Sequence, residues 1–478
     1  MVFTSFKFLI FFSLLFSIYY SIPIKLRWKL LLISSLFFYG SIKPIFILLL
    51  IFISIVSYFS TRLFEKITSD KNKFYFFLIT IVGVISPLFF FKYYHSINTF
   101  LSSIFELERY QNGISNSWLI LPIGISYYTF MSIGYIVDVY NEKIKAEKNF
   151  GIVLLFLSYF PLVLSGPIER AEKMFQQFKN KLSYNHNNVI NGFQLILWGV
   201  FLKMVLADNL SLNLNPVFEN LENNSGKTIL FSILLYPFQI YGDLGGYSLI
   251  AIGVSSALGI NVRINFKRPF LSNSMSSFWR RWHMSLISWI TDYIYTPISF
   301  YMRKKGLFGI IISLLITFVI AGLWHDATIS FVIWGLIQGL ILSFEASTKN
   351  IRFNFQKKFG LINNFTFNLL CSVLIYFTFS FSLIFGSAFK SLSETYLAIN
   401  KILFDYGTLF FDNQTLLKLA LIIFIVIFIE FKQEFFSNKF KIFRNKSTYV
   451  RWSSYIIIIM IIIFFGIFNN NNFIYFQF

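Results

Sequence analysis

Long apolar segments recur along the whole chain and constrain its fold more than any other feature. Each is close to the roughly 20 residues that a helix needs to cross the hydrocarbon core of a bilayer. They centre on Phe8–Ile22, Leu30–Phe59 (two helices broken at Pro44), Phe74–Phe91, Trp118–Ile136, Ile152–Leu164, Phe193–Leu206, Ile229–Leu258, Leu307–Trp324, Ala327–Phe344, Phe365–Phe385, Leu416–Phe431 and Tyr455–Phe468. Because a backbone in lipid must satisfy its own hydrogen bonds, these segments predict an all-α bundle of about 11–13 membrane helices, plus interfacial helices.

The composition agrees with lipid as the main solvent of the chain. Of 478 residues, 56% are hydrophobic and 13% are charged, so a soluble protein of this length would lack the polar residues to cover its domains. The longest polar stretch, Arg170–Asn191, is too short to hold a separate core. We therefore expect one integral-membrane domain over residues 1–478. The first segment, Phe8–Ile22, is expected to be a retained helix, since no signal-peptide cleavage site follows it.

The formal net charge of +20 is concentrated in some of the loops between the apolar segments. The basic loops are Lys25–Lys29, Arg62–Lys73, Lys143–Lys148, Lys173–Lys181, Lys349–Lys358 and Lys439–Lys446; Glu106–Ser117, Asp208–Gly226 and Asp405–Gln414 are acidic or neutral. This division predicts that the basic loops are cytoplasmic. Attraction to anionic membrane lipid accounts for the excess charge, so we expect no nucleic-acid partner.

Aromatic and basic residues gather in Phe278–Ser285. A helix through this region would carry large apolar residues on one face, at spacings of three or four: Phe278, Trp282, Leu286, Trp289 and Tyr293. Trp and Tyr beside Arg are typical of a helix at the headgroup level of a membrane. His283 is then either a solvated residue of an interfacial anchor or part of a functional site, and these residues alone leave both interpretations open.

His325 and Asp326 separate two long apolar runs, and no Gly or Pro follows them. An ionisable residue embedded in apolar sequence is costly, so by default it faces a protein interior or a wet cavity and is a candidate for function. Imidazole is suited to removing a proton from a hydroxyl near neutral pH. The alternative is a hairpin tip that places His325 in the membrane interface.

A metal site has little support in the sequence. The four histidines include no pair three or four residues apart, and no acidic cluster accompanies them. Cys371 is the only cysteine, which excludes an intramolecular disulfide. Asp138, Asp243 and Asp292 lie within or beside apolar segments, and we expect at least two of them to pair with Lys or Arg.

Five motifs resemble those of the bacterial membrane-bound O-acyltransferases, above all the alginate O-acetyltransferase subgroup. They are Leu121–Phe130 followed by Tyr135–Tyr140, Ser165–Arg170, Phe278–Ser285 continuing to Tyr295, Gly322–His325 and Phe331–Gly335. The succession of Trp279–His283 and then Gly322–His325 is highly specific. The resemblance covers residues 1 to about 345, whereas the C-terminal spans within 365–468 match only in hydropathy.

The resemblance implies that His325 is the catalytic histidine and that His283 is a second histidine of the active region. It implies a cytoplasmic acyl thioester donor such as acetyl-CoA, a polysaccharide or peptidoglycan acceptor at the cell surface, and a secreted or membrane-anchored acyl-transfer partner. It also implies a multi-pass protein of the cell's inner (plasma) membrane. Substrate binding is expected at residues around the two histidines: Trp279, Arg280, Arg281, Trp282, Asp292, Tyr293, Trp324 and Asp326.

Three positions depart from the family pattern. Asp326 stands where a small residue is usual, Leu249 where an acidic residue is common, and Ser299-Phe300 where two glycines are usual. These departures leave the substrate open, and a D-alanyl transferase for teichoic acid is the alternative enzyme. A proton-coupled transporter or flippase, with His325 and the buried aspartates as a relay, is the alternative from another class.

Overall fold

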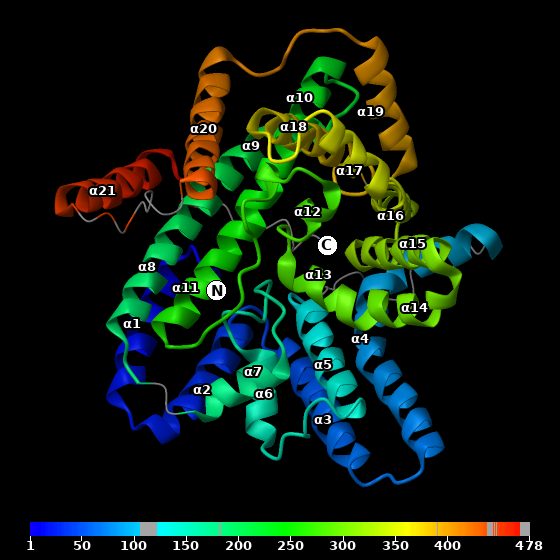
Figure 1. Cartoon of the computed structure of the whole chain (residues 1–478). Coiled ribbons are helices and arrows are strands. Elements are labelled where there is room, and N and C mark those ends of the chain that lie inside the picture. Colours follow the sequence, from blue (N-terminus) through cyan, green and yellow to red (C-terminus); the bar gives the residue numbers. More distant parts are fainter. Residues whose placement is uncertain are drawn as a thin grey trace. The chain divides into compact units, whose positions relative to one another are not determined.

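A computed structural model describes residues 1–105, 122–180, 183–389, 391–436, 443, 445 and 447–468 (Figure 1). Within these ranges the chain is helical and contains no β-strand, and Phe385 and Phe389 form one isolated bridge. The predicted all-α fold is thus confirmed. The acidic loop Glu106–Ser117, the start of the predicted segment Trp118–Ile136 and most of the basic loop Lys439–Lys446 lie outside the described residues.

Eight helical segments of the described ranges are long and apolar enough to cross a membrane. They are Phe46–Phe64, Asp70–Tyr93, His186–Glu219, Arg303–His325, Ile329–Ser347, Phe365–Ser382, Asn413–Phe435 and Thr448–Phe465. The other predicted segments fall on shorter helices. The predicted segment Leu30–Phe59 divides into α2 (Arg27–Gly40) and α3 (Phe46–Phe64), so the expected break at Pro44 is confirmed.

The described chain folds into two compact units, the first comprising Met1–Ile196 and Ser248–Arg263. Its helices are α1 (Phe6–Ser21), α2, α3, α4 (Asp70–Phe105), α5 (Ile125–Tyr140), α6 (Phe150–Ser158), α7 (Ala171–Lys179) and the larger parts of α8 (His186–Val200) and α11 (Gly246–Ala257). Buried hydroxyls join α3 to α5, since Ser57 and Ser132 share a hydrogen bond of 2.6 Å. Helix α6 ends before Pro161, because proline disfavours helical backbone in the residue that precedes it.

The second unit comprises Leu197–Tyr247 and Ile264–Phe478. Its most closely packed pair is the hairpin of α15 (Gly306–His325) and α16 (Ile329–Ser347). Glycines make this approach possible, because a Cβ on Gly322 would overlap the carbonyl oxygen of Phe331, and one on Gly335 would overlap that of Phe318. Close contact through small residues is typical of helix pairs in membranes.

Three wide, π-helical turns interrupt helices of the second unit: η3 (Phe201–Ala207), η4 (Tyr241–Gly245) and η6 (Thr291–Tyr295). The turns η3 and η4 pack together around buried Lys203, whose Nζ lies 2.8 Å from Asp208 Oδ1 and 2.6 Å from Asp243 Oδ1. Asp138 in the first unit lies 3.7 Å from Lys143. The prediction that at least two of the three intramembrane aspartates pair with cations is therefore confirmed.

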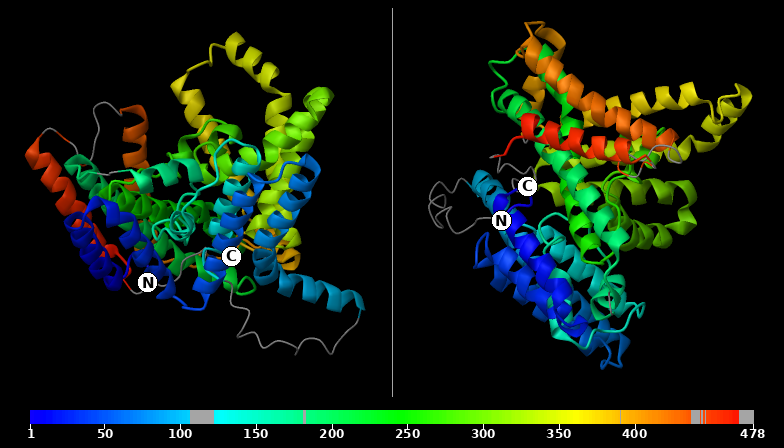
Figure 2. Two further views of the ribbon diagram at one scale, coloured as in Figure 1. Left: turned by 90° about the horizontal axis from the view of Figure 1, so that it is seen from below. Right: turned by 90° about the vertical axis from the view of Figure 1, so that its left-hand side faces the viewer.

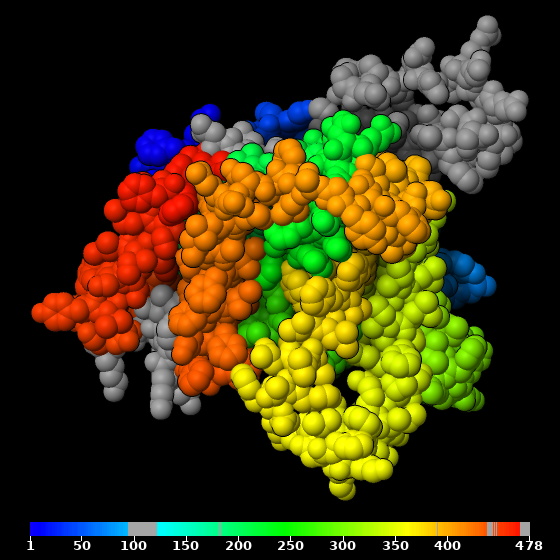
Figure 3. All heavy atoms as spheres, turned by 90° about the horizontal axis from the view of Figure 1, so that it is seen from above, coloured from blue at the N-terminus to red at the C-terminus, as the bar shows by residue number. Residues whose placement is uncertain are grey.

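The C-terminal part of the second unit consists of α17 (Lys349–Lys358), α18 (Phe365–Ser382), α19 (Leu392–Phe404), α20 (Asn413–Phe435) and α21 (Thr448–Phe465). Helix α19 packs on α10 (Gly226–Ile240), and α20 and α21 both pack on η3. Figure 2 gives two further views of these helices, and Figure 3 shows α20 and α21 (orange to red) at one face. Helix α20 places the Glu434 carboxylate beside the segment that carries His283, as described below.

Candidate active site

His325 is the last residue of α15, at the tip of the α15–α16 hairpin. The connection to α16 needs no glycine, because the Asp326 carboxylate accepts a hydrogen bond of 2.7 Å from the Ala327 backbone N–H and closes the turn. His325 therefore does lie at a hairpin tip, which was the alternative to a functional position. Its ring nevertheless packs inside the second unit, stacked on Phe331 with centroids 5.7 Å apart and edge-on to Trp334 at 5.5 Å.

His283 follows α12 (Met275–Trp279) and precedes α13 (Met284–Ile290), with left-handed backbone at φ 46° and ψ 48°. A non-glycine residue rarely adopts this conformation, and at functional sites such strain is held by surrounding contacts. The predicted continuous helix with a stripe from Phe278 to Tyr293 is therefore wrong. The chain breaks at Arg280–His283 and starts a new helix at Met284, which redirects the His283 side chain.

The His283 side chain is buried, with the residue only 2% exposed. Burial lowers the pKa of its imidazole to about 4, so the ring is neutral at physiological pH. The interpretation of His283 as a solvated interfacial residue is wrong. A neutral imidazole has one nitrogen that donates a hydrogen bond and one that accepts.

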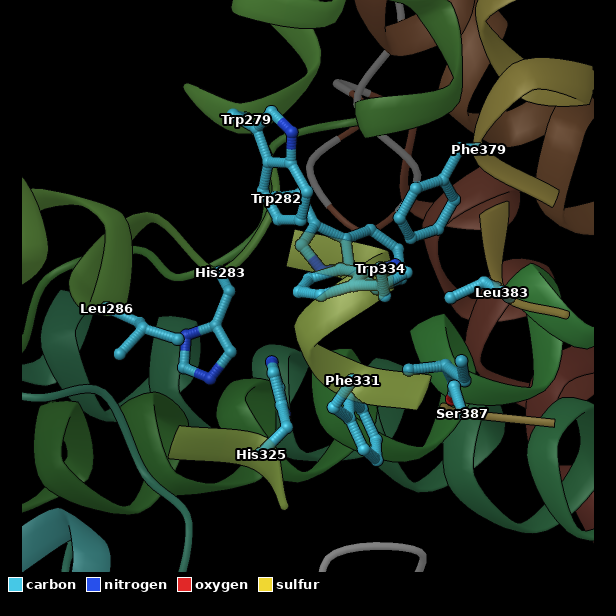
Figure 4. A pocket seen from close by; sticks show the side chains of 11 residues that line it. Trp279, Trp282, His283, Leu286, His325, Phe331, Trp334, Phe379, Leu383 and Ser387 are labelled. Carbon is cyan, nitrogen blue, oxygen red and sulfur yellow. The ribbon is translucent and has the colours of Figure 1, made fainter. Parts of the chain in front are cut away.

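The two histidines face one aromatic-walled pocket (Figure 4). The cavity volume is about 50 Å³, several times what one water molecule needs. Trp324 contacts both imidazoles, with ring centroids 6.3 Å from His283 and 4.7 Å from His325. The residues that line the pocket are Ile240, Trp279, Trp282, His283, Leu286, His325, Phe331, Trp334, Phe379, Leu383 and Ser387.

A buried polar chain supports one wall of this pocket. The Trp279 indole N–H donates to Gln338 Oε1 at 3.3 Å, and Gln338 Nε2 donates to Ser382 Oγ at 2.8 Å. The Trp334 indole N–H is also buried and donates to none of the described residues. Trp334 thus brings an unused hydrogen-bond donor to a wall that is otherwise largely apolar.

The other residues expected to bind substrate occupy different positions. Arg280 and Asp292 are exposed and Tyr293 is half-buried, and none of the three lines the pocket. The Arg281 guanidinium lies 3.0 Å from the Glu434 carboxylate. Their roles toward substrate stay predictions.

Sequence reasoning missed several residues of the pocket. Phe331 and Trp334 belong to the motif Phe331–Gly335, but the sequence did not assign them to the site. Their spacing of three residues on α16 places both rings on the face near His325. Phe379, Leu383 and Ser387 come from the end of α18 and the loop after it, in sequence with no motif to mark them. In the part of the chain that the structure describes, no group of three or more His, Cys, Asp or Glu could hold a metal ion.

A sequence profile of the membrane-bound O-acyltransferase family matches residues 148–386. This range holds both histidines and all the pocket residues except Ser387. The chain belongs to the membrane-bound O-acyltransferase family. It is therefore an O-acyltransferase and a multi-pass membrane protein, which removes the transporter alternative.

Several relatives have named activities. A probable alginate O-acetylase of Pseudomonas putida is 33% identical over 364 residues, which are 74% of this chain and 73% of that protein. A peptidoglycan O-acetyltransferase of Helicobacter pylori is 29% identical over 70% of this chain and 68% of its own length. A teichoic acid D-alanyltransferase of Streptococcus thermophilus is 29% identical over 52% of this chain and 62% of its own length.

Proposed function

We propose that this protein is an O-acetyltransferase of the inner (plasma) membrane. It moves an acetyl group from a cytoplasmic thioester, such as acetyl-CoA, to hydroxyls of a cell-surface polysaccharide or peptidoglycan. The whole chain acts as one acyltransferase. The observation that carries this proposal is the convergence of His283 and His325, from separate elements, on one small aromatic pocket.

His325 acts as the general base. Its neutral imidazole takes the proton from the acceptor hydroxyl while that oxygen attacks the thioester carbonyl. The tetrahedral intermediate then collapses, the carbon–sulfur bond breaks, and the leaving thiolate takes the proton back from the His325 imidazolium. General-base assistance of this kind is typically worth about 10²–10⁴ in rate.

His283 orients the acceptor or polarises the carbonyl. Its low pKa keeps it neutral, so its N–H donates without adding a buried charge. The Trp334 indole N–H is a second donor available to the developing oxyanion. The largely apolar, aromatic wall offers water few hydrogen-bond partners, which limits hydrolysis of the thioester.

The cavity of about 50 Å³ beside the two histidines has room for a small acyl group. The relatives named for acetyl transfer also match more of this chain than the D-alanyl transferase does, at 74% and 70% against 52%. D-alanyl transfer to teichoic acid is the second candidate, since the named relative carries out that reaction.

A secreted or membrane-anchored partner receives or guides the acetyl group at the outer surface. The support for this partner is that each compact unit of the described residues contains candidate membrane spans, so neither unit is a soluble domain that could hold a large polymer.

Two measurements test the function. Surface polysaccharide and peptidoglycan are purified from cells with and without the gene, and their ester-linked acetate and D-alanine are quantified. Acetate is expected to fall in one polymer on deletion and to return when the gene is restored. Loss of D-alanine esters alone would support the second candidate, and unchanged ester content in both polymers would contradict the proposal.

A further inference from the structure

Helix α20 lies outside the residues matched by the family profile, yet Glu434 in its last turn contacts the segment that carries His283. Glu430 and Glu434 are four residues apart on this helix, so they share one face. Glu430 is buried, and Glu434 is partly buried. Two carboxylates on a membrane-spanning helix are costly, and such residues mark positions with a specific task.

The Glu434 carboxylate bridges two arginines that belong to different stretches of the chain. Its Oε2 lies 2.5 Å from Arg268 Nε, and its Oε1 lies 3.0 Å from Arg281 Nη1. Arg281 precedes His283 by two residues. Arg268 ends a second stretch of chain and, like His283, has left-handed backbone, with φ 48°.

Hydrogen bonds join the two stretches that Glu434 bridges. The Lys267 N–H donates to the Arg281 carbonyl at 2.9 Å, and the Met284 N–H donates to the Asn265 carbonyl at 2.8 Å. Asn265 Oδ1 accepts from both the backbone N–H and the hydroxyl of Ser285, at 3.1 and 2.8 Å. His283 is therefore framed on each side by bonds to Asn265–Lys267, which supply the contacts that its strained backbone needs.

Glu430 reaches the same region one turn earlier. Its carboxylate accepts a hydrogen bond from the Tyr241 hydroxyl. The Tyr241 ring packs against Phe266 at 5.7 Å and Trp282 at 6.3 Å, measured between centroids. Trp282 lines the pocket and adjoins His283.

We infer that the end of α20 is a positioning element of the active site, in which Glu434, supported by Glu430, holds the Asn265–Arg268 and Arg281–Ser285 stretches together and so fixes the direction of the His283 imidazole. Neither carboxylate touches the pocket, so both act through other residues. Removing Glu434 loosens the segment, exposes His283 and misaligns it relative to His325. The activity readout of this inference rests on the proposed acetyl transfer, whereas the exposure of His283 does not.

The test compares wild-type protein with Glu434→Gln, both full-length in lipid nanodiscs. Diethyl pyrocarbonate modifies accessible neutral imidazoles, and mass spectrometry of the peptides gives the rate at each histidine. The rate at His283 is expected to rise several-fold in Glu434→Gln, because local opening becomes easier. Exposed His186 is the internal reference and should react at an unchanged rate.

Glu142→Gln is the matched control. Glu142 also pairs with one cation, Lys73 at 2.9 Å, but it is exposed and lies in the first unit. This change should leave the His283 labelling rate unaltered.

Arg281→Lys is the second variant, to be used if Glu434→Gln does not fold. Lysine keeps the positive charge but loses the planar guanidinium that fits a carboxylate, so the labelling rate at His283 should rise less than in Glu434→Gln.

Acetyl transfer gives the second readout. Glu434→Gln is expected to lower kcat about tenfold or more with little change in KM for the thioester, because misalignment of the reacting groups affects the chemical step. An unchanged His283 labelling rate in folded Glu434→Gln would overturn the inference. Absence of acetyl transfer in the wild type would instead overturn the proposed function, and the labelling would still decide the role of α20.

Discussion

His325 combines two features that the sequence presented as alternatives. It lies at the tip of a helical hairpin, and it also faces an aromatic pocket shared with His283. A hairpin-tip histidine needs only to be polar, whereas a general base needs a nitrogen that titrates near neutral pH. Substitutions that preserve size and polarity therefore separate the two roles.

His325→Gln is expected to lower acetyl transfer by at least about a hundredfold, the low end for lost general-base assistance. Glutamine keeps a hydrogen-bonding amide of similar size but cannot accept the proton. The measurement is transfer from labelled thioester in membranes that hold equal amounts of each variant. His283→Asn is the comparison; it should be milder, since the role of His283 is orientation and asparagine tolerates left-handed backbone. Activity of His325→Gln within a few-fold of wild type would refute the base assignment.

His283 is also expected to make stability depend on pH. Burial lowers its folded-state pKa to about 4 from 6.5, so between these values the unfolded chain binds more protons than the folded protein. The contribution of neutral, buried His283 to the free energy of unfolding is present in full above pH 6.5. It is lost as the pH falls toward 4, by up to about 3 kcal/mol. Melting temperatures at pH 7.5 and pH 5 should therefore differ less for His283→Asn than for wild type. An equal difference in the two proteins would count against burial of a neutral His283.

Sequence motifs located both histidines but not the geometry that joins them. The apolar stripe from Phe278 to Tyr293 has helical spacing, yet the chain breaks within it at Arg280–His283. Hydrogen bonds from residues that precede the motif, above all Asn265, override the local preference for a helix. Such contacts are tertiary, so periodicity could not have predicted them.

At the scale of elements, helix boundaries followed from sequence where proline or glycine stops a helix. The break between α2 and α3 at Pro44 is one example. The π-helical turns were not predicted, because hydrophobic periodicity does not distinguish a short π-helical turn from the α-helix around it. The turns η3 and η4 bring Lys203 to Asp243, and this pairing of residues 40 positions apart exists only in the folded chain.

The α15–α16 hairpin depends on close approach through glycine. In Gly335→Ala the new methyl group would overlap the Phe318 carbonyl, so the helices must separate and His325 must shift. We expect a stability loss of about 1–3 kcal/mol, measured as a lower melting temperature of the purified protein, together with reduced acetyl transfer. The control is Gly83→Ala in α4, where a Cβ meets open space. Equal melting temperatures for Gly335→Ala and wild type would show that the hairpin does not need the glycine.

At the scale of the whole molecule, the sequence predicted the fold class but not how many segments span the membrane. Hydropathy counts every apolar run, but only Ile152–Ser158 of the predicted segment Ile152–Leu164 is helical, and Ile229–Leu258 contains the π-helical turn η4 between α10 and α11. Neither predicted segment is among the eight candidate spans of the described residues. For the C-terminal helices, hydropathy predicted the spans but not their contacts. Helix α20 supplies the Glu434 carboxylate, which pairs with Arg268 and with Arg281 in the segment that carries His283.

The orientation of the second unit in the membrane follows from its charges and its hairpin. Helices α15 and α16 are antiparallel neighbours, so Arg303–Lys305 before α15 and Lys349 after α16 lie on one side. Both ends are basic and should be cytoplasmic, which puts the His325 tip at the opposite end of the hairpin. Reporters fused at Lys349 and at Lys179 in the first unit should report cytoplasm, whereas one at Asn223 should report the outer side. An external Lys349 with a cytoplasmic Asn223 would invert this orientation, and the thioester would then have to reach the site from the hairpin tip.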